Sequence, residues 1–138
     1  YRGVNMLSNN IIYTQNNIIY VNYNGVFCEQ SAARFEKNFR SIVNARNKHT
    51  FSILEDISYL EGATPEAFII LNNVNKWLLT QELICKAYIH EECVYTSIMK
   101  HHVPVLNGIN TAFFIEKSSA LQWINGQSTG FNVLREAL

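Results

Sequence analysis

The sequence predicts a single α/β domain built on a mixed, mostly parallel five-stranded sheet with helices on its faces. Two observations carry this prediction. Two strand-like segments flank Asn16-Asn17, a pattern typical of a β-hairpin. After the hairpin, strand-like and amphipathic helical segments alternate along the chain. The element order is therefore ββαβαβαβα. Because parallel strands can be joined only by long crossover connections, the helices between the strands indicate a mostly parallel sheet.

β-Branched and aromatic residues dominate five short segments, which we expect to be the strands. They cover residues 11–15, 18–23, 51–54, 83–89 and 111–115. Asparagine tolerates positive φ, so Asn16-Asn17 is expected to form a tight turn and Asn24-Gly25 to close the second strand. Residues 51–54 are expected to be an interior strand that is buried on both faces and ends at Asp56. A loop containing Gly62 follows.

Four segments are the expected helices: three show an apolar stripe at helical spacing, and the carboxylates of Glu91 and Glu92 favour the start of the other. They cover residues 28–46, 64–81, 93–102 and 117–125. The second has the clearest start, because Thr64-Pro65-Glu66 combines a hydroxyl cap, a proline at the first helical position and an early carboxylate. Pro104 should end the third helix and Gly126 the fourth. The core-facing residues of the first two helices are Ala32, Phe35, Phe39, Ile42, Val43, Ala67, Leu71, Val74 and Leu78.

The length and composition suit one compact unit. The 138 residues match a single domain, and a hydrophobic content of 48% is enough for a full core. We expect residues 1–138 to form one domain whose core spans about residues 10–125. Residues 1–9 are expected to be a loosely held lead-in and residues 127–138 a loosely held tail.

The charge balance argues against several classes of partner. Eleven basic and eleven acidic residues cancel, so the chain has no electrostatic footprint for nucleic acid or an anionic membrane. No apolar run approaches the roughly 20 residues of a membrane span. The near-zero net charge mildly favours self-association. Three cysteines, Cys28, Cys85 and Cys93, cannot all pair and fit a reducing compartment, so we expect a cytoplasmic protein.

Several landmarks together resemble a known family. They are the strand and turn from Ile18 to Gly25, the strand Ile53-Leu-Glu-Asp56, the helix opening Thr64-Pro65-Glu66-Ala67, and Phe113-Phe114 followed by Ala120-Leu-Gln-Trp123-Ile124. Their order and spacing over about residues 10–125 resemble the STAS-like fold of anti-sigma-factor antagonists. The bacterial offshoot of STAS-like or CRAL-TRIO-like small proteins is more similar still. The resemblance implies a non-enzymatic module that binds a protein.

The chain departs from this family between the third strand and the second helix. Phosphorylation-switched antagonists carry an aspartate–serine–serine–glycine-like run there. Here the run is Asp56-Ile-Ser58-Tyr-Leu-Glu-Gly62-Ala-Thr64, which offers the hydroxyls of Ser58 and Thr64 but lacks the motif. We therefore expect partner binding without a phosphate on Ser58.

The candidate binding surface consists of this loop and the helix residues that lie off the buried stripe. Its members are Asp56, Ser58, Tyr59, Thr64, Phe68, Ile69 and Leu79. Each has a structural alternative. Asp56 would accept backbone N–H bonds within the loop, and Thr64 would be a plain N-cap. The apolar members are either covered by the sheet or exposed as a patch for a partner.

Metal binding and nucleophilic catalysis are weakly supported. His90, Cys93, His101 and His102 are candidate zinc ligands, but Cys93 and His101 would lie about 12 Å apart on one helix. Zinc needs its ligands about 2 Å from one centre, so no metal is expected. Cys28 is either a thiolate activated at a helix N-terminus or a small buried residue on the apolar face before Ala32. No motif indicates a cofactor.

The leading interpretation is an interaction or regulatory module that binds a protein partner or a second copy of itself. The first alternative is a protein that binds a lipid or another small apolar ligand. It is less favoured, because the predicted elements use nearly the whole chain and leave little to wall off a cavity. The second alternative is an enzyme of unrecognised type.

Overall fold

The structure is a computed structural model that describes residues 10–90, 98 and 100–137. Its sheet consists of β1 (Ile11–Gln15), β2 (Ile18–Phe27), β3 (Phe51–Ala63), β4 (Leu83–Ile89) and β5 (Thr111–Phe114). The helices are α1 (Glu29–Ala45), α2 (Pro65–Leu78), the short 3₁₀ helix η2 (Pro104–Gly108) and α4 (Lys117–Ala137). The predicted helix 93–102 lies largely outside the described residues, which are helical at 98 and 100–102.

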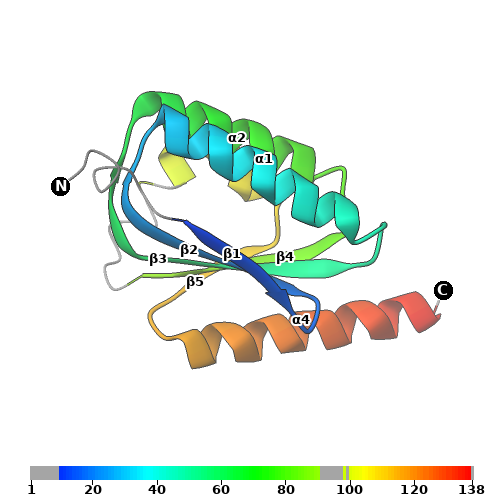
Figure 1. Cartoon of the computed structure of the whole chain (residues 1–138). Helices are drawn as coiled ribbons and strands as arrows, with labels where there is room; N and C mark the ends of the chain where they lie inside the picture. The colour runs from blue at the N-terminus through cyan, green and yellow to red at the C-terminus, as the bar shows by residue number, and fades with distance from the viewer. Residues whose placement is uncertain (1–9, 91–97, 99, 138) are drawn as a thin grey trace.

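The strands lie side by side in sequence order, β1-β2-β3-β4-β5. β1 pairs antiparallel with β2, and the other neighbours pair parallel, which confirms the predicted mixed sheet. Because each parallel strand is added on the same side of the previous one, right-handed crossovers put their helices on one face. Figure 1 shows α1 and α2 on that face and α4 on the other.

The predicted hairpin turn is confirmed. Asn16 and Asn17 have φ values of 53° and 64°, which match the positive values that a two-residue hairpin turn requires. The turn fixes the register, in which Tyr13 lies opposite Tyr20. The two rings stack with centroids 4.7 Å apart. This stacking covers part of the sheet at its β1 edge.

β2 and β3 are longer than the sequence predicted. Asn24-Gly25 does not end β2, and residues 57–63 continue β3 instead of forming a loop. The two strands satisfy each other's backbone groups across this extension, where Asn24 lies opposite Tyr59 and Phe27 opposite Ala63. Two register shifts interrupt the ladder and bend both strands, as β-bulges do. Figure 1 shows their ends curving toward α1 and α2.

β3 is the middle strand, and the prediction that residues 51–54 are interior is confirmed. These residues are buried on both faces. The larger core lies between the sheet and α1 and α2, and it includes Ile19, Val21, Phe27, Phe35, Phe39, Ile53, Leu71, Val74 and Leu78. The smaller core lies under α4 and includes Ile18, Tyr20, Leu54, Cys85, Ala87, Ala120 and Ile124.

The predicted end of the last helix at Gly126 is wrong. α4 runs for 21 residues and passes through both Gly126 and Gly130. Glycine permits the left-handed conformation that ends many helices but does not impose it. In a helix interior it costs about 1 kcal/mol relative to alanine. Residues 127–137 are therefore a helical extension of α4.

Candidate partner-binding surface

α2 begins with the cap that the sequence predicted. The Ala67 backbone N–H donates to Thr64 Oγ1 at 3.2 Å, with Pro65 at the first helical position. The buried stripe of α2 is also as predicted, since Ala67, Leu71 and Leu78 are among its buried residues. The cap accounts for Thr64 as a structural residue. It also fixes where α2 leaves the end of β3.

Asp56 takes the structural role proposed for it, although it lies within β3. Its Oδ1 accepts a hydrogen bond from the Ser58 backbone N–H at 2.9 Å. Asn22 lies opposite Asp56 in the parallel register. The side chains of Asp56 and Ser58 are both half-buried. One carboxylate oxygen thus stabilises the local backbone where β3 begins to bend.

Asp56 and Tyr59 line a shallow hollow of about 140 Å³ at this end of the sheet. The other lining residues are Ile11, Asn22, Tyr23 and Asn24. The Tyr59 side chain is 73% exposed and Ile11 is 54% exposed. Sequence reasoning missed these neighbours because β1 and β2 reach Asp56 only through strand register, which places Ile11 opposite Asn22 and Asn22 opposite Asp56.

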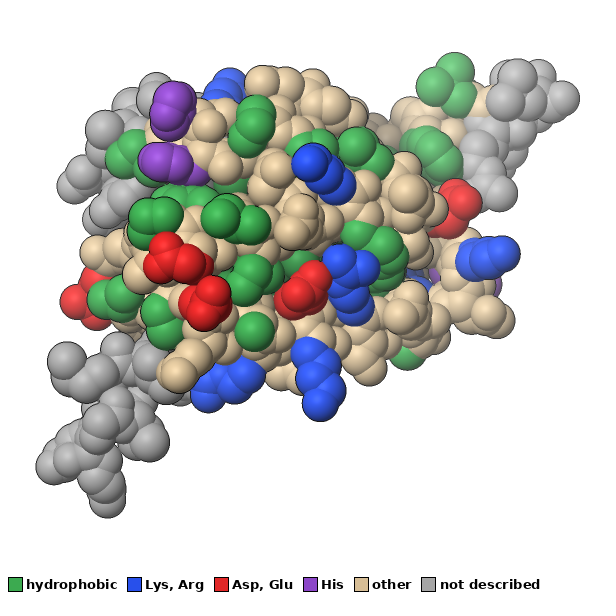
Figure 2. All heavy atoms as spheres, turned by 90° about the horizontal axis from the view of Figure 1, so that it is seen from above, with side chains coloured by type: hydrophobic (Ala, Val, Ile, Leu, Met, Phe, Trp, Pro, Cys, Tyr) green, Lys and Arg blue, Asp and Glu red, His purple; other side chains and the backbone are tan. Residues whose placement is uncertain are grey.

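The three apolar candidates on α2 separate into different environments. Phe68 is half-buried and stacks on His102, with ring centroids 4.4 Å apart. Ile69 is 63% exposed, and Leu79 is also exposed at the far end of the helix. Ten residues of helix separate Ile69 from Leu79 by about 15 Å. Figure 2 shows this helical face, on which hydrophobic side chains alternate with charged ones.

The predicted residues therefore do not form one site. Asp56, Ser58 and Tyr59 lie within β3, five to eight residues before Thr64, which caps α2, and Ile69 follows in the second turn of that helix. Phe68 belongs to the core side of α2, and Leu79 lies at the opposite end of the helix.

A buried polar cluster that the sequence did not reveal lies between the sheet and α2. Tyr23 donates to Glu55 Oε1 at 2.5 Å, and Lys86 Nζ lies 2.5 Å from Glu55 Oε2. Lys86 also donates to Asn75 Oδ1 at 2.7 Å, and Asn75 donates to the Leu71 carbonyl at 2.8 Å. These contacts join β2, β3, β4 and α2 through one chain of hydrogen bonds and one ion pair.

Burial dominates the electrostatics of this cluster. Burial raises the pKa of Tyr23 well above its usual value, and the Glu55 charge raises it further. The pKa of Tyr88 is raised well above its usual value by the same two causes. Both phenols therefore stay protonated at neutral pH. A cavity of about 20 Å³ beside Glu55 has room for about one water, so the cluster holds strands together and offers no space for a substrate.

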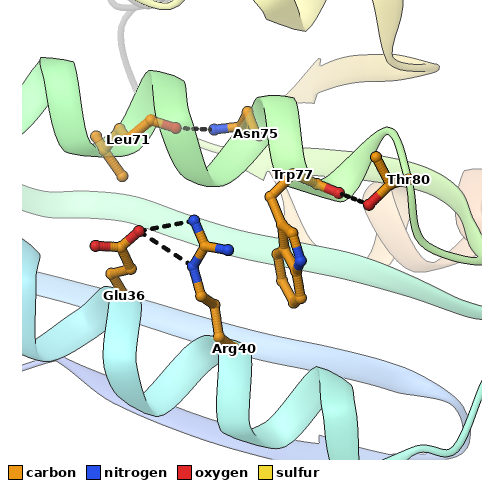
Figure 3. A network of polar contacts seen from close by, with 6 residues as sticks. All are labelled: Glu36, Arg40, Leu71, Asn75, Trp77 and Thr80. Atoms are coloured by element: carbon orange, nitrogen blue, oxygen red, sulfur yellow. Dashed lines mark hydrogen bonds and ion pairs between the residues drawn. The ribbon is translucent and has the colours of Figure 1, made fainter.

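The side chains of Arg40 and Trp77 join α1 to α2, and Figure 3 shows them facing each other. Arg40 donates twice to Glu36 Oε2, through Nε at 3.1 Å and through a terminal nitrogen at 2.8 Å. Its guanidinium lies 4.7 Å from the centroid of the Trp77 ring, close enough for a cation–π interaction. One charged and one aromatic side chain therefore link the two helices.

Cys28 does not lie on the buried stripe of α1. It is the half-buried N-cap of that helix. The Ser31 hydroxyl donates to its Sγ at 3.5 Å, and this hydrogen bond lowers the pKa of Cys28. Among the described residues, no three His, Cys, Asp or Glu side chains gather in a metal-binding arrangement, and Cys93 lies outside them. Within the same residues, no helix is both long and apolar enough to cross a bilayer.

Solved structures share this architecture over most of their length. One is an uncharacterized protein with a SpoIIAA-like fold from Shewanella loihica PV-4, at a TM-score of 0.64 and 16% identity, covering 84% of this chain and 92% of that one. Another is an anti-sigma factor antagonist from Mycobacterium paratuberculosis, at a TM-score of 0.62 and 13% identity, covering 86% of this chain and 94% of that one. The chain has a STAS-like, SpoIIAA-like fold.

A third STAS-like neighbour is the anti-sigma factor antagonist SpoIIAA in its unphosphorylated form. Its TM-score is 0.61 at 6% identity, covering 86% of this chain and 99% of that one. No protein-family model and no curated protein matches the sequence. The predicted STAS-like fold class is confirmed by these structural likenesses.

Proposed function

We propose that this chain is a non-enzymatic regulatory module whose protein partner binds at the junction of β3 and α2. The observation that carries the proposal is the exposure of two large side chains, Tyr59 and Ile69, which come five residues before and five residues after the Thr64 cap in the sequence. Aromatic and aliphatic anchors of this kind supply most of the binding energy in protein interfaces. The hollow that Tyr59 and Asp56 line gives this part of β3 a concave surface.

The structural neighbours support a regulatory role. Two of them are named anti-sigma factor antagonists, a name that denotes action on another protein. The free thiols of Cys28 and Cys85 support a reducing, cytoplasmic setting. We place the partner at the β3–α2 junction because the capped helix and the hydrogen-bonded Asp56 hold this part of the surface in one conformation.

The two alternative functions have less support. A pocket for a small organic ligand usually occupies about 300–1,000 Å³. The cavity between the sheet and α2 is only about 20 Å³. A larger space of about 600 Å³ beside α4 is an open groove and does not enclose a ligand. An enzyme would need a reactive group that a substrate can reach, and the Glu55–Lys86 pair is buried and already engaged. A protein surface requires neither a cavity nor a free reactive group.

The proposal is tested by affinity capture from the source cells, with quantitative mass spectrometry of what is retained. Wild-type protein should enrich a specific protein that the Tyr59→Ala and Ile69→Asp variants lose by at least about tenfold. Asn73→Asp is the matched control, because it adds the same charge to an exposed position of α2 without removing an apolar side chain. Equal capture by all four proteins would refute a partner at this surface.

A further inference from the structure

The C-terminal half of α4 extends beyond the core that holds the first half in place. Ala120 and Ile124 are fully buried, but no described side chain of α4 after Ile124 is buried. Figure 1 shows this end of α4 running past the strands. Isolated helices shorter than about 12–15 residues are marginal in water, and two glycines weaken this one further. The extension therefore needs packing that one copy of the chain supplies only in part.

An open groove of about 600 Å³ runs along one flank of this extension. Its lining includes Ile84 from β4 and the α4 residues Gly126, Gly130, Val133 and Leu134. These α4 positions are four, seven and eight residues apart, so they lie on one side of the helix. Val133 is 58% exposed and Leu134 is 67% exposed. The flank thus combines two positions without side chains, at the glycines, with two exposed apolar side chains.

The same helix carries no charge over a long stretch. From Ser118 to Leu134 it contains no Asp, Glu, Lys or Arg. Solvent-facing helices normally carry charged residues on their outer side, whereas the centres of interfaces are depleted of them. A charged partner would lose hydration here without finding an opposite charge. An equally uncharged helix loses no such hydration.

We propose that this flank of α4 is a dimerisation surface whose occupant is the same flank of a second copy of this chain. A twofold interface requires one surface to be complementary to itself. This flank meets that requirement, because the groove and the exposed Val133 and Leu134 lie side by side on each copy and can exchange between copies. Added Cβ atoms at Gly126 and Gly130 would meet nothing within 4 Å in one copy. The glycines are thus not needed for the packing of the monomer but allow another backbone to approach closely.

The dimer is independent of the proposed partner surface. Figure 1 shows the C-terminal end of α4 at the opposite end of the molecule from the point where β3 meets α2, so pairing through this end of α4 leaves the proposed partner surface accessible. A dimer would therefore present two partner-binding surfaces at once. Failure of one proposal leaves the other standing, because different variants test them.

The direct test is sedimentation equilibrium of the purified chain over a series of concentrations. The mass should rise from 15.9 kDa toward twice that value. Leu134→Lys introduces a charge at an exposed position and should weaken the dimer at least about tenfold while the monomer stays folded. Asn132→Lys is the matched control, because it adds the same charge in the same turn on the other side of α4 and should leave the dimer unchanged.

A second variant separates dimer loss from misfolding. Gly130→Gln should strengthen the helix of the monomer, because glutamine is a much better helix former than glycine. It should nevertheless weaken the dimer about tenfold or more, since its side chain blocks close approach of the two backbones. Ile69→Asp on α2 should leave the dimer intact.

Three results would overturn the inference. The first is a mass of 15.9 kDa at every concentration. The second is a dimer that both Leu134→Lys and Gly130→Gln leave unchanged, because the interface would then lie elsewhere. The third is a monomer that yields a stoichiometric lipid on solvent extraction, which would assign the groove to a ligand.

Discussion

The two faces of the sheet carry helices of very different surface character. α1 has 17 residues, of which Glu29, Arg34, Glu36, Lys37 and Arg40 are charged. The stretch from Ser118 to Leu134 on the other face has the same length and no charge at all. Both helices bury an apolar stripe against the sheet. Burial alone therefore does not distinguish the two helices. Their outer surfaces do, because α1 carries the charged residues typical of a helix that faces solvent.

The difference extends to the cores beneath the helices. On the α1 and α2 face, a large core of aromatic and aliphatic residues surrounds the Glu55–Lys86 ion pair. On the α4 face, the core is smaller and ends at Ile124, and the helix continues past it. The first face is complete within one chain. The second becomes complete when α4 packs against another surface.

The largest expected effect on stability comes from the larger core, which lies between the sheet and the helices α1 and α2. Phe39 is almost fully buried in the larger core, so Phe39→Ala should cost about 3–5 kcal/mol of unfolding free energy. The matched change on the other face, Val133→Ala, should cost under about 0.5 kcal/mol in dilute monomer, because Val133 is largely exposed. Urea denaturation measures both. Similar losses at the two sites would contradict the contrast between the faces.

Breaking the buried Glu55–Lys86 ion pair should lower the unfolding free energy by nearly as much. Lys86→Met leaves the Glu55 carboxylate without its cation and should cost about 3–5 kcal/mol. Adding Glu55→Gln to that variant removes the unpaired charge and should recover part of the loss. Urea denaturation at neutral pH measures both proteins. A double variant less stable than Lys86→Met would show that the carboxylate contributes through contacts other than the ion pair.

The same cluster predicts a loss of stability at alkaline pH. The pKa values of Tyr23 and Tyr88 are raised in the folded protein, chiefly by burial. Their contribution is complete below the unfolded pKa of about 10 and falls by about 1.4 kcal/mol per pH unit per tyrosine above it. The slope lasts until the pH reaches the folded pKa. Thermal melts from pH 9 to 11 should show a shallower decline for a Tyr88→Phe variant, and parallel curves would contradict this origin.

A smaller effect is expected at the edge of the partner surface. Thr64→Ala removes the acceptor for the Ala67 N–H and should cost about 1 kcal/mol. Thr64→Ser keeps the hydroxyl and is the control, expected to lie within about 0.5 kcal/mol of wild type. Thermal denaturation monitored by circular dichroism measures both. A Thr64→Ala protein as stable as wild type would mean that the cap contributes nothing to α2.

The sequence predicted most of the fold because local signals determine most of it. The Asn16-Asn17 turn, the Thr64 cap and the alternation of strands and helices each need only neighbouring residues. The missed features depend on tertiary register. Glu55 and Lys86 read as ordinary strand residues until the pairing of β3 with β4 brings them to one face.

Two other features of the structure were not predicted for the same reason. Residues 57–63 look like a loop, and only the extended pairing with β2 keeps them in β3. The hollow beside Asp56 needs Ile11 and Asn22, which approach through strand register and not through sequence proximity. Candidate site residues chosen from one stretch of sequence therefore cover part of β3 and the start of α2, but not the part of the hollow that β1 and β2 contribute.

The smallest expected effect concerns Ser58, which lies in the segment where phosphorylation-switched antagonists carry their double-serine motif. Here the Ser58 backbone N–H, and not its hydroxyl, makes the hydrogen bond to Asp56. Ser58→Ala keeps that N–H, so stability and partner capture should both match wild type. A phosphate on Ser58 would also put negative charge beside the Asp56 carboxylate, which repulsion disfavours. Intact-mass spectrometry of protein isolated from its own cells should therefore show no phosphate at Ser58, and a stoichiometric phosphate there would instead make this junction a phosphorylation switch.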